Sequence, residues 1–167
     1  MAAKKRSAKA ESDVKFIARN RKARFNFEFL ERFEAGLVLQ GTEVKSLRAG
    51  QCNLGDAYAE IRKGELWLKN LHISPYEQAS RENHEPLRAR KLLMHRREIR
   101  RLEGKVAERG LTLVAVSLYF KKGKAKCELA LARGKKVHDK RASAADKDME
   151  RKVRNAMRGG MRRRGQE

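Results

Sequence analysis

The segment from Phe25 to Gly50, FNFEFLERFEAGLVLQGTEVKSLRAG, decides the predicted fold class. Its aromatic side chains all fall on odd positions with mostly polar residues between them, which is the period of a strand with one buried face. These aromatic residues are Phe25, Phe27, Phe29 and Phe33. Gly36 interrupts the pattern, so we expect a bulge or sharp bend near residues 31–36. Thr42 suits a helix N-cap and Gly50 a helix stop, so a long strand is predicted to lead into a short helix.

The remaining core elements follow from the same two periodicities. Strands are predicted where apolar residues alternate or form short β-branched runs, and a helix where they recur every three or four residues. The predicted elements are a hairpin over 56–73 with its turn at 62–65, a long surface loop over 76–89, a helix over 90–109, and a second hairpin over 111–131 with its turn at 121–124.

Short antiparallel strands in a domain of roughly 120 residues favour a small barrel, because closure removes the exposed edges of apolar strands. We therefore expect a mainly β fold, an OB-type antiparallel β-barrel with flanking helices, over residues 14–133. Residues 1–13 are expected to be a disordered basic N-terminus. Residues 134–167 are expected to be a basic tail, disordered alone and partly helical on a partner. A two-layer α+β sandwich could be built from the same elements.

The charge of the chain points to a polyanionic partner. The sequence holds 42 Lys and Arg against 21 Asp and Glu, giving a net charge of +21 and a pI of about 10.6. Nucleic acid is the leading candidate for such a partner. No apolar run approaches the roughly 18 residues that span a bilayer, and the N-terminus lacks an apolar signal core, so we expect a soluble cytoplasmic protein. The isolated Cys52 and Cys127 are expected to stay reduced.

Motifs for catalysis are missing from the sequence. Neither a P-loop, a GxGxxG fingerprint, a GxSxG elbow nor an HExxH helix is present. The four histidines are far apart, and we expect structural roles for His72 and His84. We therefore predict no catalytic residues, no metal and no cofactor. An RNA-modifying enzyme is the least favoured class, whereas a generic RNA-binding or ribosomal OB-fold protein fits the composition well.

Basic residues beside the aromatic strand form the first candidate RNA-binding group. An ordered strand would hold them near an aromatic face, which is the combination that RNA-binding surfaces use. This group is Arg19, Arg21, Lys22 and Arg24. Further RNA-binding residues are predicted in the short helix and in the second hairpin turn, namely Lys45, Arg48, Lys121, Lys122 and Lys124.

Four motifs in this order resemble the SmpB family of bacterial SsrA-binding proteins over about residues 20–141. They are EAGLVLQGTEVKSLRAGQCNLGDAY (34–58), RARKLLMHRREI (88–99), VAVSLYF (114–120) and GKKVHDKR (134–141). The resemblance implies an OB-fold core that binds the tRNA-like domain of tmRNA (SsrA RNA). It also implies a tail that occupies the decoding centre and the empty mRNA channel of a stalled ribosome. Trans-translation would follow, with elongation factor Tu and alanyl-tRNA synthetase acting on the same tmRNA and no catalysis by this chain.

The resemblance also implies particular site residues. Glu34 matches a carboxylate used for tmRNA binding, and Lys91 and Leu93 match a second RNA-binding patch. Arg90, next to Lys91, is also predicted to bind RNA. His95 falls where some members carry Asn. The implied ribosome-binding tail residues are Gly134, Lys135, Lys136, His138, Asp139, Lys140, Arg141, Met149, Arg151, Lys152, Val153, Arg154 and Met157. Met149 stands where some relatives have an aromatic residue.

Overall fold

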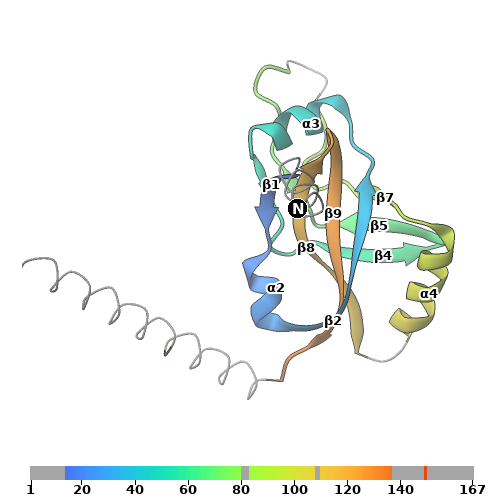
Figure 1. Ribbon diagram of the computed structural model, residues 1–167. Coiled ribbons are helices and arrows are strands. Elements are labelled where there is room, and N and C mark those ends of the chain that lie inside the picture. The colour runs from blue at the N-terminus through green and yellow to red at the C-terminus, as the bar shows by residue number, and fades with distance from the viewer. Residues whose placement is uncertain (1–13, 80–82, 108–109, 137–148, 150–167) are drawn as a thin grey trace, which may run out of the picture. The chain divides into compact units, whose positions relative to one another are not determined.

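The computed structural model describes residues 14–79, 83–107, 110–136 and 149 (Figure 1). The chain divides into two compact units, Met1–Gly134 and Lys135–Glu167, and all the labelled elements belong to the first. The predicted disordered N-terminus lies outside the described residues. The predicted tail helix does so as well, except for Met149, which is helical and exposed.

The strand that carries the aromatic pattern begins at Phe27 rather than at Phe25, and another strand precedes it. Strand β1 (Val14–Arg19) is followed by a short helix, α2 (Arg21–Asn26), and strand β2 (Phe27–Leu37) starts only after it. Asn20 causes this turn, because its side-chain oxygen accepts a hydrogen bond from the Ala23 N–H at 2.9 Å and caps the helix. Its amide group donates to the carbonyls of Leu54, Gly55 and Ala115, which fixes α2 against the barrel.

A bulge in β2 changes which face the odd-numbered residues occupy. The register with strand β9 (Lys124–Gly134) shifts between Phe29 and Glu31, just before the predicted range of 31–36. Phe27 and Phe29 accordingly pack with Ala23 of α2 outside the barrel, whereas Phe33 packs against the main core. The prediction that the aromatic residues form one buried row is therefore wrong. The extra residue at the bulge reverses which side of the sheet the odd-numbered residues face.

Strand β7 (Arg90–Leu93) replaces the first turn of the predicted 90–109 helix. It pairs with β5 (Glu65–Lys69) and β2, and α4 (Arg96–Ala107) begins only after it. Arg90 and Leu92 point inward while Leu93 is exposed, which is a strand's alternation. The partners that stabilise this strand are distant in sequence, so local periodicity does not reveal it.

The two predicted hairpins are present with tight turns. The first joins β4 (Tyr58–Arg62) to β5, and the second joins β8 (Leu111–Lys121) to β9 (Lys124–Gly134). Both turns have two residues with positive φ, Lys63-Gly64 and Lys122-Gly123, as two-residue hairpin loops require.

Two local predictions need correction. Residues 72–73 do not extend the first hairpin, because Asn70 has a φ of 56° and strand β6 (His72–Ile73) pairs with β3 (Cys52–Asn53) instead. Helix α3 (Gly41–Arg48) is capped by Gln40, not Thr42: the Glu43 carboxylate accepts the Gln40 N–H at 2.7 Å in a capping box. The described part of the 76–89 loop contains no helix or strand, as predicted.

The large sheet closes into a barrel, which confirms the predicted fold class. Among the described residues its strand order is β1-β8-β4-β5-β7-β2-β9, and β9 pairs back onto β8, so six antiparallel strands form a ring with β1 added to β8. The interior is filled by leucines and small residues, and Cys127 is fully buried there as a free thiol. Figure 1 shows α2 beside β1 and α4 on the opposite side of the barrel. This fold is a small OB-type barrel with flanking helices.

Candidate nucleic-acid interface

The outward surface of strands β1, β8, β9, β2 and β7 forms one continuous face, which we call the outer face. Directly paired residues in an antiparallel sheet project to the same side. One row of paired positions crosses all five strands through Phe16, Tyr119, Lys126, Gly36 and Leu93. The adjacent row crosses four of them through Arg19, Ser117, Glu128 and Glu34. The outer face therefore combines aromatic, cationic and carboxylate groups from distant parts of the sequence.

Glu34 lies at the centre of this face within a polar network. Its carboxylate accepts hydrogen bonds from the Tyr119 hydroxyl at 2.6 Å and the Lys121 Nζ at 2.9 Å, and Lys126 Nζ lies 3.5 Å away. The hydrogen bonds from Tyr119 and Lys121 hold the pKa of Glu34 below its ordinary value. Burial and the neighbouring carboxylate raise the pKa of Tyr119, so its hydroxyl remains a donor. Glu34 is therefore an ionised acceptor with a fixed orientation.

Leu93 lies next to β2 on the same face. A Cβ added at Gly36 would lie 3.3 Å from the Leu93 Cβ, so the glycine allows a close approach between the strands. The Leu93 side chain is 54% exposed, and Lys91, two residues before it, forms an ion pair with Glu65. His95 is exposed in the link to α4. Glu34 and Leu93, predicted from separate motifs, thus lie on neighbouring strands of one face.

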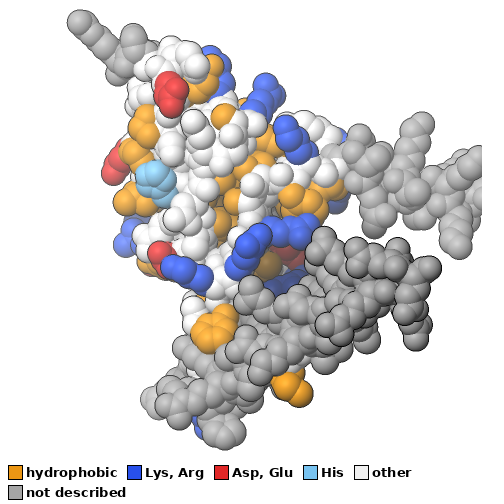
Figure 2. All heavy atoms as spheres, turned by 90° about the vertical axis from the view of Figure 1, so that its left-hand side faces the viewer, with side chains coloured by type: hydrophobic (Ala, Val, Ile, Leu, Met, Phe, Trp, Pro, Cys, Tyr) orange, Lys and Arg blue, Asp and Glu red, His pale blue; other side chains and the backbone are white. Residues whose placement is uncertain are grey.

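Four arginines surround a hollow at the β1 edge of the outer face, which we call the arginine hollow. Its volume is about 470 Å³. The lining residues are Phe16, Arg19, Asn20, Arg21, Arg24, Arg32, Val116, Ser117 and Glu128. Figure 2 views the molecule from the side that carries β1 and α2, where Lys and Arg side chains lie among hydrophobic ones. Three of the four residues predicted in the basic lead-in meet here, whereas Lys22 is exposed on α2 outside the lining.

The remaining predicted RNA-binding lysines and arginines lie elsewhere. Lys45 and Arg48 of α3 line a separate cavity of about 360 Å³, where Lys45 Nζ is 5.1 Å from the centre of the Tyr76 ring. Lys122 and Lys124 are exposed at the β8–β9 turn, and of this hairpin group only Lys121 contacts Glu34. The structure does not bring the α3 pair into the outer face.

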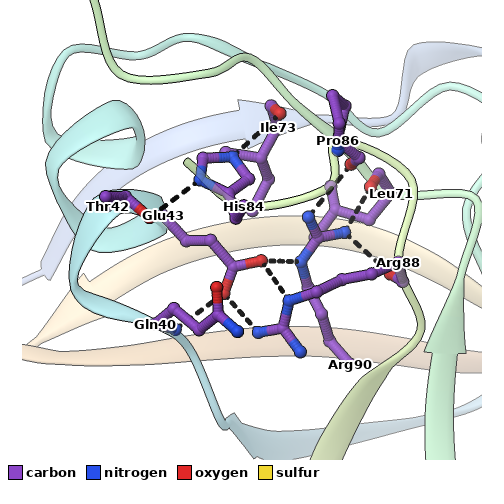
Figure 3. Close-up of polar contacts among 9 residues, drawn as sticks. All are labelled: Gln40, Thr42, Glu43, Leu71, Ile73, His84, Pro86, Arg88 and Arg90. Atoms are coloured by element: carbon purple, nitrogen blue, oxygen red, sulfur yellow. Dashed lines mark hydrogen bonds and ion pairs between the residues drawn. The ribbon is translucent and has the colours of Figure 1, made fainter. Parts of the chain in front are cut away.

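The prediction that Arg90 contacts RNA is wrong, because Arg90 is fully buried. Its Nε donates to Glu43 at 2.8 Å, and its terminal nitrogens donate to the carbonyls of Leu71, Arg88 and Pro86 (Figure 3). Glu43 is also fully buried and accepts further hydrogen bonds from Arg88. This ion cluster fastens α3 to the long loop and the barrel.

His84 connects the long loop to α3 and β6, in agreement with the structural role predicted for it. Its Nδ1 lies 3.0 Å from the Thr42 hydroxyl, and its Nε2 lies 3.1 Å from the Ile73 carbonyl oxygen. Both ring nitrogens are therefore occupied by contacts within the fold.

In the described ranges no three His, Cys, Asp or Glu side chains gather as a metal site would require. None of the helices in the described part of the chain is long and apolar enough to cross a bilayer.

Several outer-face residues were not predicted from sequence. Phe16, Arg32 and Tyr119 belong to the face only because β1 and β2 pair with β8 and β9. The available signal for the first of them was an aromatic residue within a basic segment. Among the predicted tail residues, Gly134 ends β9, Lys135 and Lys136 follow it, and Met149 is exposed. The remaining tail residues, from His138 to Met157, lie outside the described residues.

Comparisons with protein families, curated proteins and solved structures all find similarity to the same family. The model of the family described as "SmpB protein" matches residues 17–159. An SsrA-binding protein of Desulforudis audaxviator is 58% identical over 150 residues, covering 90% of this chain and 98% of the relative. One from Carboxydothermus hydrogenoformans is 59% identical over 144 residues, covering 86% and 97%. A solved structure described as "tmRNA-SmpB: a journey to the center of the bacterial ribosome" matches with a TM-score of 0.62 and 54% identity, covering 72% of this chain and 85% of that chain.

Proposed function

The chain belongs to the SmpB family, and we infer that it is an RNA-binding adaptor that binds tmRNA and delivers it to stalled ribosomes for trans-translation. The observation that carries this inference is the position of Glu34. An RNA binder that recognised phosphate alone would gain nothing from a carboxylate among cations. A fixed carboxylate can accept hydrogen bonds from base amino groups or ribose hydroxyls, which distinguishes one RNA from another.

The outer face is the proposed tmRNA-binding surface. Glu34 and Leu93 would provide the selective contacts, while the surrounding cations would neutralise phosphates. The predicted contacts retained on or near this face are Arg19, Arg21, Lys22, Arg24, Lys91, His95, Lys121, Lys122 and Lys124. Lys45 and Arg48 stay in the proposal as a separate contact on α3, outside the outer face. The adaptor would supply shape and charge to the RNA and perform no bond chemistry of its own.

The two parts of the chain would address different partners. The barrel, which β9 completes at Gly134, would hold the tRNA-like domain of tmRNA, and residues 135–167 would enter the decoding centre and the empty mRNA channel of the ribosome. Elongation factor Tu and alanyl-tRNA synthetase would act on the same tmRNA in the cytoplasm. The basic composition of 134–167, with the GKKVHDKR motif at its start, supports an RNA-lined destination.

Replacing Glu34 with alanine tests the proposal through the sign of its effect. The change removes a negative charge, so a binder driven by charge alone should bind RNA slightly more tightly. We expect weaker binding to the tRNA-like domain, by about 1–3 kcal/mol, because a hydrogen bond involving a charged group is lost. Titrations of the labelled RNA domain against wild type and E34A measure the difference.

Glu60→Ala is the matched control for this experiment. Glu60 lies on β4, outside the outer face, and pairs with Lys69 and Arg62 at the surface. It removes the same charge, so its binding should be unchanged or slightly tighter. Glu34→Gln keeps an acceptor for Tyr119 and separates lost charge from lost geometry. Equal gains in affinity for E34A and E60A would contradict the selective role of Glu34.

A further inference from the structure

The arginine hollow has the composition of a nucleotide site. Its volume of about 470 Å³ falls within the roughly 300–1,000 Å³ typical of ligand sites. Arg19, Arg21, Arg24 and Arg32 give it a strong positive potential, and guanidinium groups suit phosphate oxygens particularly well. Charge of this kind would hold the backbone of a nucleic acid but would not by itself recognise a base.

An aromatic platform lies beside these cations. The Phe16 side chain is 49% exposed although Phe is a large apolar residue, and the Arg19 guanidinium carbon lies 4.0 Å from the centre of its ring. The Tyr119 ring supports Phe16 from the neighbouring strand, with 5.6 Å between ring centres. A flat ring paired with a guanidinium plane offers a stacking surface of the kind that unpaired bases use.

Hydrogen-bonding groups complete the lining. Ser117 donates to the Glu128 carboxylate at 2.7 Å, and Arg32 bonds the other carboxylate oxygen at 3.1 Å. Each carboxylate oxygen has a second lone pair, so Glu128 can accept from the amino group of a base. Asn20 does not take this role, because its side chain is buried and occupied by backbone partners.

We propose that the arginine hollow holds one unpaired RNA nucleotide, its base stacked on the Phe16–Arg19 pair and its phosphates among Arg21, Arg24 and Arg32. The inference rests on the proposed function for the identity of the RNA, but the pocket chemistry requires only an unpaired nucleotide. The base edge would face Ser117 and Glu128. The site is distinct from Glu34 and Leu93 and extends recognition to the β1 edge of the outer face.

Fluorescence of a stacked base tests this site directly. The probe is a single-stranded RNA hexamer carrying one 2-aminopurine, whose emission falls when the base stacks, titrated with the full-length chain. Wild type and Phe16→Tyr should quench the emission, whereas Phe16→Leu should not, because it keeps apolar volume but loses the ring. Binding of the tRNA-like domain should weaken roughly tenfold in F16L.

Salt dependence separates stacking from charge. F16L should leave the slope of affinity against salt unchanged, whereas Arg19→Gln should lower both affinity and slope, the slope by about one. Leu87→Ala, at a 56% exposed side chain in the long surface loop, is the apolar control, and Arg100→Gln on exposed α4 is the charge control. R100Q should leave the quenching intact. Thermal unfolding of each variant confirms that it is folded.

Three results would contradict the proposal that the arginine hollow binds an unpaired nucleotide. They are the absence of quenching by wild type at saturation, equal quenching by a folded F16L, and displacement of the hexamer by a polyglutamate peptide of equal charge. The last would make the hollow a general anion site. Failure of the proposed function looks different: wild type would quench the hexamer through Phe16 yet show no preference for the tRNA-like domain over other RNAs.

Discussion

Glu43→Ala should destabilise the protein by about 3–5 kcal/mol, the largest expected effect of any single substitution considered. The change removes the carboxylate that pairs with both the fully buried Arg90 and Arg88. It also removes the acceptor that caps α3 at Gln40. Urea denaturation followed by circular dichroism measures the loss as a lower midpoint of unfolding.

The control for this effect is the surface pair of Glu60 and Lys69. Both side chains are partly exposed, so Glu60→Ala should cost less than about 1 kcal/mol. Similar midpoints for E43A and E60A would mean that the buried cluster contributes no more than an exposed ion pair. That outcome would contradict its role in fastening α3 and the long loop to the barrel.

The Glu43 cluster also predicts a pH dependence. Burial acts to raise the pKa of Glu43, but hydrogen bonds from Arg88, the Gln40 N–H and Arg90 outweigh it and hold the pKa below the ordinary 4.5. The ionised carboxylate therefore stabilises the fold above pH 4.5, and this contribution disappears as the pH falls through the lower folded-state pKa. The stability gap between wild type and E43A should accordingly narrow below pH 4.5.

Deleting residues 135–167 should abolish peptide tagging while leaving the preference for tmRNA intact. The deletion begins at Lys135 because β9 runs to Gly134, which pairs with Phe27 and completes the barrel. The retained unit keeps its own hydrophobic core and the whole outer face. Tagging is measured by transfer of labelled alanine to peptides on ribosomes stalled at the end of a truncated mRNA.

A full-length variant with His138 and Arg141 replaced by alanine is the companion to this deletion. It changes two residues of the GKKVHDKR motif and keeps most of the tail's charge. Tagging should fall while binding to the tRNA-like domain stays near wild type. If the deletion removed tmRNA preference together with tagging, the assignment of separate partners to core and tail would be wrong.

Local periodicity predicts elements whose partners are adjacent in sequence. Both hairpins have alternating residues and a Lys-Gly turn, so their strands follow from the chain itself. Strand β7 does not, because its pairing with β5 and β2 outweighs the helical spacing that continues into α4. The bulge after Phe29 is predicted only approximately, near residues 31–36, because Glu31 and Gly36 break the aromatic row just after the register shifts.

The sequence also predicts individual residues of the candidate interface but not their arrangement. Glu34 and Leu93 are found through family motifs, and Arg19, Arg21 and Arg24 through local charge. Their arrangement on one face depends on strand pairing that composition does not encode. Arg90 shows where prediction from local charge fails. It lies in a basic segment, yet it is buried in an ion pair with Glu43, which lies 47 positions earlier. No local signal distinguishes it from the neighbouring Lys91.

The outer face is proposed to recognise tmRNA by more than its charge. The most direct measurement is binding of the full-length chain to the tRNA-like domain of tmRNA, in competition with an elongator tRNA and a length-matched unstructured RNA, over a range of salt concentrations. We predict a preference for the tRNA-like domain that persists as salt rises, because hydrogen bonds and stacking are less screened than phosphate contacts. Equal competition by all three RNAs, with binding lost together as salt rises, would contradict the claim.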